Sequence, residues 1–172
     1  MKNLIITGAA GQIGQVFVQY LSDLNKYKVY ALDNNFIDKK PLVNVKYIEL
    51  DITNEKEVVK FYNTLDAVEV LINNAGVGVF TPFEERTAEE FMNVVDVNMK
   101  GTFLMCRESI KKMKITMNGK IVNIGSIYGM VSSDPRIYGE SGRNNSEVYS
   151  MTKAGVIMLT KYLATHYADC NI

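Results

Sequence analysis

The sequence predicts a doubly wound α/β fold, in which helices cover both faces of a parallel sheet. Short apolar runs alternate with longer amphipathic ones along the chain, the runs are rich in Val and Ile, and a glycine-rich turn follows the first run. Such alternation is typical of repeated βα units. The length of 172 residues suits one domain, which we expect to cover residues 1–172.

Five strands are expected where short apolar runs are bounded by turn residues. Because these runs are apolar nearly throughout, they suit strands that helices cover on both faces. The expected strands are residues 3–7, 28–32, 45–50, 68–73 and 120–126.

Four helices are expected between the strands, where apolar residues recur with helical spacing. The expected helices are residues 12–24, 54–66, 87–114 and 147–168. Asn54 with Glu57, and Thr87 with Glu90, each place a carboxylate three residues after a polar cap, where it can reach free backbone N–H groups.

Composition excludes some classes of partner. Nineteen basic and nineteen acidic residues give a net charge of zero, so nothing attracts the chain to nucleic acid or to an anionic membrane. We therefore expect a small-molecule partner. Glycines interrupt the apolar start before a secretory or membrane-spanning segment can form, and a cytoplasmic location is expected by default. Cys106 and Cys170 lack metal-like spacing, so we expect no metal site and interpret them as free thiols or small buried hydrophobic residues.

The first strand runs into "TGAAGQIGQVF", where Gly8, Gly11 and Gly14 are spaced three apart at the start of a helix. Glycines there let the backbone approach a pyrophosphate at the helix N-terminus. The alternative is an ordinary turn before a helix.

Asp33 lies at the end of the second strand, where a carboxylate can accept hydrogen bonds from an adenosine ribose. No Arg or Lys is adjacent to Asp33 or inside the glycine loop, so NAD is favoured over NADP. The alternative for Asp33 is a solvated loop residue.

Five further motifs follow the glycine loop in a fixed order: "LDIT" (50–53), "NNAG" (73–76), "VNMKG" (97–101), "IVNIGS" (121–126) and "YSMTK" (149–153). With this ordered set the whole chain resembles the short-chain dehydrogenase/reductase family. The resemblance implies a Rossmann-type sheet that binds a nicotinamide dinucleotide, and hydride transfer between the cofactor and an alcohol or carbonyl. The catalytic residues it implies are Asn98, Ser126, Tyr149 and Lys153. The cofactor-binding residues it implies are Gly8, Gly11, Gln12, Ile13, Gly14, Asp33, Asp51, Ile52, Asn74, Ala75, Gly76, Tyr149 and Lys153.

The chemistry of the residues agrees with these roles. Tyr149 and Lys153 are four residues apart on a helix and point the same way. A nearby ammonium group favours the ionised form of a phenol, so Tyr149 could exchange a proton with the substrate oxygen. Ser126 could hydrogen-bond that oxygen, and Asn98 is a poor helix former that we expect to hold a water. The alternative is that Tyr149 and Lys153 form only a solvated pair on a helix surface.

Two spacings depart from the common family pattern. The middle glycine of the loop is Gly11, whereas shorter members usually have it one position later, where this chain has Gln12. Tyr149 follows Ser126 by 23 positions, whereas shorter members leave about a dozen. Both features are similar to the longer sugar-nucleotide branch, whereas "NNAG" and "VNMKG" are typical of the shorter type, so the branch stays open. The polar segment 132–147 is either a functional excursion or a flexible insert. As part of a pocket it could contact a sugar.

Family members continue beyond the point where this chain stops, so we expect a C-terminally truncated protein that lacks the last strands and the substrate lid. An exposed strand edge and an apolar helix face would favour association, and we expect a homo-oligomer, either a dimer or a tetramer. The function expected is an NAD-dependent oxidoreductase for a secondary alcohol or ketone, with a sugar or sugar nucleotide favoured. The alternative is a non-catalytic dinucleotide-binding fragment or module.

Overall fold

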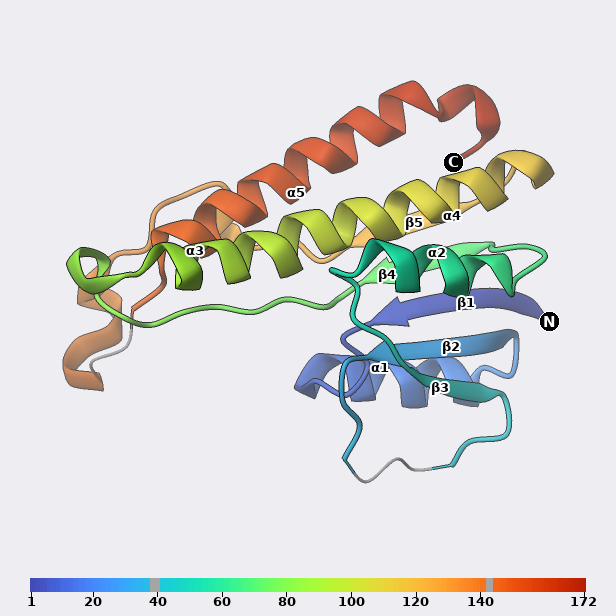
Figure 1. The fold of residues 1–172 in the computed structure, drawn as a ribbon, viewed down its shortest axis with the longest axis horizontal. Coiled ribbons are helices and arrows are strands. Elements are labelled where there is room, and N and C mark those ends of the chain that lie inside the picture. The colour runs from blue at the N-terminus through green and yellow to red at the C-terminus, as the bar shows by residue number, and fades with distance from the viewer. Residues whose placement is uncertain (38–40, 142–143) are drawn as a thin grey trace.

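The computed structural model describes residues 1–37, 41–141 and 144–172, and its centre is a five-stranded parallel sheet of order β3-β2-β1-β4-β5 (Figure 1). The strands are β1 (Lys2–Thr7), β2 (Tyr27–Asp33), β3 (Val45–Glu49), β4 (Val70–Asn73) and β5 (Lys120–Asn123). The helices are α1 (Gln12–Asp23), α2 (Glu55–Asn63), α3 (Ala88–Val95), α4 (Thr102–Thr116) and α5 (Glu147–His166). The predicted doubly wound, Rossmann-type fold class is therefore confirmed.

Two hydrophobic cores lie on opposite faces of the sheet, because successive strand residues point to opposite sides. Leu4 and Ile6 of β1 face α1, whereas Ile5 faces the core built with α2 and α4. The expectation that helices cover every strand on both faces is wrong for the edge strand β5. Val122 there is 46% exposed, because α1 packs mainly against β1 and β2.

The strands all run in one direction, so their carboxyl ends meet at one edge of the sheet. β1 lies between β2 and β4, with Leu4 paired to Val29 on one side and to Val70 on the other. The chain moves outward in opposite directions from β1 and from β4. A crevice at such a switch point, outside the carboxyl ends of the strands, is where open parallel sheets bind ligands.

The helix predicted over residues 87–114 is present but is not a regular α-helix. Thr87 and Glu90 form the predicted capping box at its start: Glu90 N donates to Thr87 Oγ1 at 3.1 Å, and Thr87 N donates to Glu90 Oε2 at 2.9 Å. Between α3 and α4 the backbone forms a π-helical turn over Asp96–Gly101, which the sequence did not predict. The pair Asn54 and Glu57 differs from a capping box, because Glu57 Oε2 accepts from Asp51 N at 3.4 Å.

The described parts of the polar segment, residues 132–141 and 144–147, lie away from the sheet, next to the start of α5 (Figure 1). Residues Pro135–Ser141 form short 3₁₀ turns, and the hydroxyl groups of Tyr138 and Tyr128 lie 2.6 Å apart. Residues 142 and 143 lie outside the described part of the chain. The segment thus has defined contacts with the chain that follows β5.

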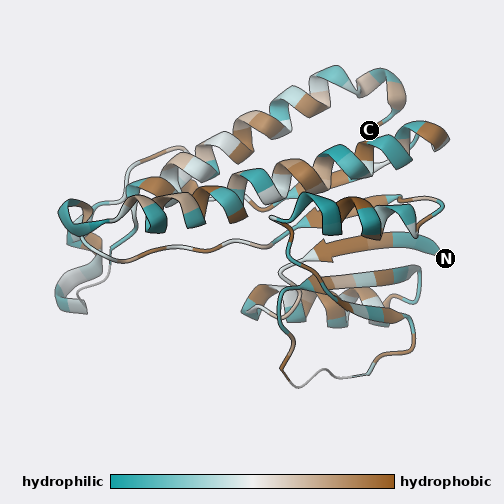
Figure 2. Ribbon diagram, viewed as in Figure 1, coloured by the Kyte–Doolittle hydropathy of each residue, from teal (hydrophilic) through white to brown (hydrophobic). Residues whose placement is uncertain are grey.

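The helices have mixed surfaces, with hydrophilic and hydrophobic residues alternating around them (Figure 2). In the described ranges, no helix is both long and apolar enough to cross a bilayer. Both cysteines are free, as expected. Cys106 is buried, and burial raises its pKa to about 12, so the thiol stays neutral in the core, where its Sγ accepts a hydrogen bond from Asn73 Nδ2 at 3.2 Å.

Candidate active site

The glycine loop between β1 and α1 packs closely against the chain after β4 and against the first turn of α1. At these contacts there is no room for a side chain on the glycines. Gly8 has a φ of 65°, and a β-carbon there would lie 2.7 Å from Ala75 Cα. A β-carbon on Gly14 would lie 2.0 Å from Gly8 O. Gly14 therefore lets α1 pack against the loop, and it does not line the cavity described below.

The start of α1 leaves backbone N–H groups free. Gly11 is the N-cap and provides no side-chain hydrogen bond, and the first bond inside the helix runs from Gln15 N to Gly11 O at 3.0 Å. The N–H groups of the first helical turn, from Gln12 onward, therefore have no intrahelical acceptor. The first turn of α1 also contains no acidic residue. This positive helix end suits an anion.

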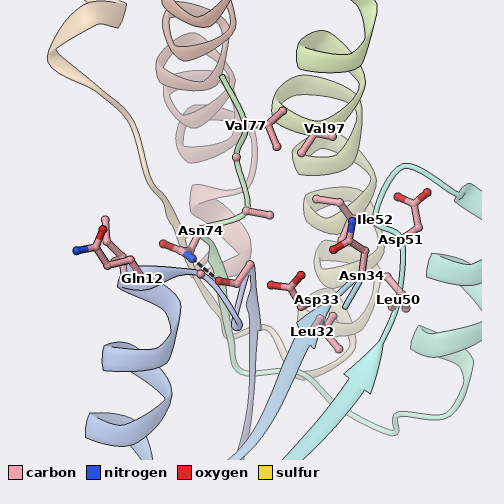
Figure 3. Close-up of a pocket in the computed structure, with 15 residues that line it drawn as sticks. Gln12, Leu32, Asp33, Asn34, Leu50, Asp51, Ile52, Asn74, Val77 and Val97 are labelled. Atoms are coloured by element: carbon pink, nitrogen blue, oxygen red, sulfur yellow. Dashed lines mark hydrogen bonds between the residues drawn. The ribbon is translucent and has the colours of Figure 1, made fainter. Parts of the chain in front are cut away.

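A cavity of about 360 Å³ opens beside this helix end, at the carboxyl edge of the sheet (Figure 3). Ten of the predicted cofactor-binding residues line it: Gly8, Gly11, Gln12, Ile13, Asp33, Asp51, Ile52, Asn74, Ala75 and Gly76. Five lining residues were missed: Leu32, Asn34, Leu50, Val77 and Val97. Each of the five is adjacent in sequence to a predicted site residue, so extending the predicted sites by one residue on either side would have included them.

Two acidic residues line this cavity: Asp33 is the last residue of β2, and Asp51 lies two residues after the neighbouring strand β3 (Figure 3). Asp33 Oδ2 accepts a hydrogen bond from Ala10 N at 2.9 Å, which fixes the glycine loop to the end of β2. Asp51 Oδ1 accepts from both N and Oγ1 of Thr53 at 2.8 Å. No lysine or arginine is found among the described residues that line the cavity.

The "NNAG" segment after β4 forms another wall and is bonded directly to the glycine loop. The Thr7 hydroxyl accepts from the backbone N–H groups of Asn74 and Ala75, both at 3.1 Å. Asn74 Nδ2 donates to Thr7 O at 3.1 Å and to Gly8 O at 2.9 Å. The walls of the cavity thus hold one another in place.

Asn98 lies buried in the π-helical turn and holds the chain just after this segment. Its Oδ1 accepts from Val77 N at 2.8 Å, and its Nδ2 donates to Val77 O at 3.0 Å and to Thr152 Oγ1 at 3.1 Å. Single π-helical turns inside α-helices are frequent at functional sites. Both amide hydrogens are used by the protein, and the expected water on Asn98 stays a prediction.

Tyr149 and Lys153 come together on the first turns of α5. Lys153 Nζ lies 5.5 Å from the centre of the Tyr149 ring and donates to Ile124 O at 2.7 Å. The lysine is 6% exposed, and burial lowers its pKa because it disfavours the charged form. The pair is therefore not an exposed helix surface.

Three of the four predicted catalytic residues converge on the segment Gly76–Gly78. A β-carbon on Gly76 would lie 3.4 Å from Asn98 Oδ1 and 3.6 Å from Lys153 Nζ, and one on Gly78 would lie 3.9 Å from Tyr149 Cδ2. Ser126 is different: its Oγ accepts from Tyr128 N at 3.1 Å. Within the described residues no hydrogen bond joins Ser126 to Tyr149.

A second cavity, of about 700 Å³, begins beyond this segment. Val77 lines the first cavity and Val79 the second, so the convergence point of the catalytic residues separates the two. The other walls of the second cavity come from residues 128–133, after β5, and from residues 144–147, 150, 151 and 154, at the start of α5. Sequence reasoning anticipated the polar loop here but not the arginine, Arg86, that lines this cavity.

Comparison with known proteins agrees with this geometry. Residues 2–172 match the short chain dehydrogenase family. The 3-oxoacyl-[acyl-carrier-protein] reductase FabG of Rickettsia bellii is 33% identical, over 99% of this chain and 68% of its own. A short chain dehydrogenase from Leptospira borgpetersenii, solved with bound NAD+, is 43% identical with a TM-score of 0.91, over 99% of this chain and 67% of that one. ElxO with NADP bound is 28% identical with a TM-score of 0.83, over 98% and 69%. The chain thus spans about two thirds of the length of these proteins.

Proposed function

Because the chain belongs to the short-chain dehydrogenase family of oxidoreductases, we propose that it binds a nicotinamide dinucleotide and transfers hydride between that cofactor and a secondary alcohol or ketone. The observation that carries the proposal is the convergence of Asn98, Tyr149 and Lys153 beside Gly76, at the end of a cavity built on a free helix N-terminus. The activity of the whole protein is part of the proposal, since the chain spans about two thirds of its relatives.

The residues present fit such a cofactor. Free N–H groups at the start of α1 suit a pyrophosphate, and the close approach of Gly8 to Ala75 leaves no room for a side chain between them. Asp33 would hold the adenosine ribose, and Asp51 and Ile52 would border the adenine. Lys153 would hold the nicotinamide ribose. The cofactor, when bound, supplies or accepts the hydride.

The chain's own side chains supply the proton chemistry. The Tyr149 hydroxyl exchanges a proton with the substrate oxygen, and Lys153 stabilises the phenolate that remains. Ser126 is proposed to hydrogen-bond the same oxygen, which requires its hydroxyl to turn from Tyr128 N. Asn98 keeps the wall of the site in place by holding Val77 at both its N–H and its carbonyl.

We propose that the cofactor is NAD, because the carboxylate of Asp33 would repel a 2′-phosphate. The test is calorimetric titration of wild type and Asp33→Asn with NADH and NADPH. The asparagine keeps an oxygen that can accept from Ala10 N but removes the charge. Wild type should bind NADH about tenfold or more tightly than NADPH. Repulsion of about 1.4 kcal/mol between the Asp33 carboxylate and the 2′-phosphate corresponds to about tenfold in affinity. The asparagine variant should lose most of this preference. Equal affinities in the wild type would refute it.

For the substrate, we propose a polyhydroxylated ketone or alcohol. The second cavity has a polar wall from the loops on either side of the 3₁₀ turns, which suits hydroxyl groups. Its polar lining includes Ser132, Ser133, Asn144, Asn145, Ser146 and Ser150. Steady-state assays with simple ketones, sugars and sugar nucleotides test this proposal. A clear preference for unsubstituted ketones would contradict it.

Binding without turnover is the second candidate function. The observation that favours it is that Ser126 Oγ accepts from Tyr128 N and, within the described residues, is not hydrogen-bonded to Tyr149, so the four predicted catalytic side chains are not all assembled. Cofactor titration and hydride-transfer assays on the same sample separate the two candidates. Affinity with turnover supports the enzyme, and affinity without turnover on any substrate supports the binding module.

A further inference from the structure

Arg86 is an unusual residue for its position, because its charged side chain is only 6% exposed. It lies between the 3₁₀ turn Phe83–Glu85 and the N-cap of α3. Its Nη2 donates to Thr81 O at 2.6 Å, and its Nε lies 2.9 Å from Glu147 Oε1. Nε makes no hydrogen bond there, and Nη1 is buried with no hydrogen-bond partner among the described residues.

The two partners of Arg86 belong to different parts of the proposed active site. Thr81 lies in the segment 77–86, which connects β4 to α3, and its hydroxyl also bonds to Glu90. Glu147 is the first residue of α5, two residues before Tyr149. The guanidinium therefore joins segment 77–86 to the first turn of α5, which carries the proposed proton donor, Tyr149.

The segment 77–86 is thus attached at both ends to the helices that carry the catalytic side chains. At its start, Val77 is held by Asn98 of the π-helical turn. At its end, Arg86 reaches Glu147 of α5. Between these points, a β-carbon on Gly78 would lie 3.9 Å from Tyr149 Cδ2, so the segment runs directly past the tyrosine ring.

We propose that Arg86 is a positioning residue for Tyr149, an inference that rests on the proposed function. Burying a cation is costly unless opposite charges and acceptors stay close to it. Any movement of the first turn of α5 away from segment 77–86 would separate the buried Arg86 from Glu147 and leave it with the more distant attraction of Glu90. The cost of that separation restricts where Tyr149 can lie.

A direct role in binding a ligand anion fits less well. Glu147 already balances the charge of Arg86, and the two nitrogens without hydrogen bonds, Nε and Nη1, are both buried. The large cavity that both residues line therefore offers an anion no free, accessible guanidinium edge.

The test compares Arg86→Leu, Arg86→Lys and Glu147→Gln with the control Arg136→Leu. Arg136 also pairs with a carboxylate, Asp134, but its side chain is 90% exposed, in the 3₁₀ segment. Amide hydrogen exchange reports the opening of local regions of a fold. Arg86→Leu should speed exchange in residues 147–153 by about tenfold, while β1 keeps its protection. Arg86→Lys should restore part of the protection, because lysine keeps the charge but not the planar fork.

A spectroscopic readout addresses the tyrosine itself. With tyrosines labelled at Cζ with ¹³C, the Tyr149 signal is identified by its loss in Tyr149→Phe. In Arg86→Leu this signal should shift or broaden, whereas the signal of Tyr62, buried in the core, should not move. Faster amide exchange throughout the chain, with an unshifted Tyr149 signal, would show that Arg86 serves only global stability. The proposal would also be overturned if neither the amide exchange of residues 147–153 nor the Tyr149 signal changed.

If Arg86→Leu does not fold, Glu147→Gln replaces it, and faster exchange confined to residues 147–153 is again expected. NADH titration of the same samples tests the proposed function separately, because neither Arg86 nor Glu147 lines the first cavity. If the wild type did not bind NADH, the proposed function would be refuted, whereas the amide exchange measurements on Arg86 would stand.

Discussion

At the scale of single residues, Tyr149 and Lys153 are neighbours with different tasks. The tyrosine is assigned to proton transfer, and the lysine to both the phenol and the cofactor ribose. In a form of the protein with measurable hydride transfer, Tyr149→Phe should lower kcat by about 100-fold or more, the usual contribution of a positioned acid or base. NADH affinity should stay nearly unchanged, because only the hydroxyl is lost.

Lys153→Ala should instead damage both turnover and NADH affinity. The measurements are steady-state kinetics and calorimetry, with Tyr167→Phe, a tyrosine near the end of the chain, as the control. Ordinary turnover in Tyr149→Phe would mean that the pair has no catalytic role.

The burial of Lys153 also predicts how stability depends on pH. Burial lowers the pKa of Lys153 below the ordinary lysine value of 10.5. As pH rises through the lowered pKa, the folded chain releases a proton that the unfolded chain keeps until about pH 10.5. The unfolded state then binds more protons, so the free energy of unfolding rises with pH in that window.

Lys153→Met should remove this rise. Urea unfolding followed by circular dichroism at several alkaline pH values measures it, with Lys161→Met on the same helix as the control. An equally steep pH dependence in Lys153→Met and wild type would contradict the assignment.

At the scale of elements, the π-helical turn between α3 and α4 places Asn98 against Val77. Gly101 closes this turn, and a β-carbon there would lie 2.7 Å from both Cγ1 and Cδ1 of Ile52, which lines the first cavity. The turn and the cavity wall therefore share one tight contact.

Gly101→Ala should destabilise the protein and weaken cofactor binding. Overpacking costs about 1–3 kcal/mol, whereas replacing glycine by alanine in a helix gains about 1 kcal/mol. We expect a net loss of about 1 kcal/mol, because Ile52 is buried and cannot move aside freely. The control is Gly155→Ala on α5, where the new methyl group would meet mainly the flexible end of Met99. Denaturant unfolding and NADH titration check the prediction, and equal stability of both variants would refute it.

At the scale of the whole molecule, exposed apolar side chains lie along α5, on the π-helical turn that packs against α5, and on the first turn of α4. This helix-pair surface consists of Met99, Phe103, Met151, Met158 and Tyr162, which are 39–63% exposed. Met151, Met158 and Tyr162 recur at helical spacing, and Gly155 between them brings α5 against Met99. An apolar surface of this kind is typical of an interface.

We predict that the chain forms homo-oligomers through the helix-pair surface. Met158→Lys should shift sedimentation toward the monomer, because an ammonium group cannot be buried there without a partner. Val16→Lys, at an equally exposed apolar position on α1, should leave the oligomer intact. A monomeric wild type, or equal effects of both lysines, would exclude this interface.

The sequence by itself determined the local features of this protein. Runs of Val and Ile placed the five strands, cap residues such as Thr87 placed helix starts, and the glycine spacing placed the loop beside α1. These signals act over a few residues, where backbone sterics and hydrogen bonding decide the outcome. The ordered motifs also carry the family resemblance that implied thirteen cofactor-binding residues, and ten of these line one cavity.

The tertiary structure alone decided what depends on contacts between distant segments. The π-helical turn holds Asn98 against Val77 and Gly101 against Ile52, and both partners lie far from the turn in sequence. The exposure of Val122 depends on how far α1 reaches across the sheet, and the pairing of Arg86 with Glu147 joins residues 61 positions apart. Periodicity cannot reveal such contacts, because it records which face of an element is apolar and not which element will cover it.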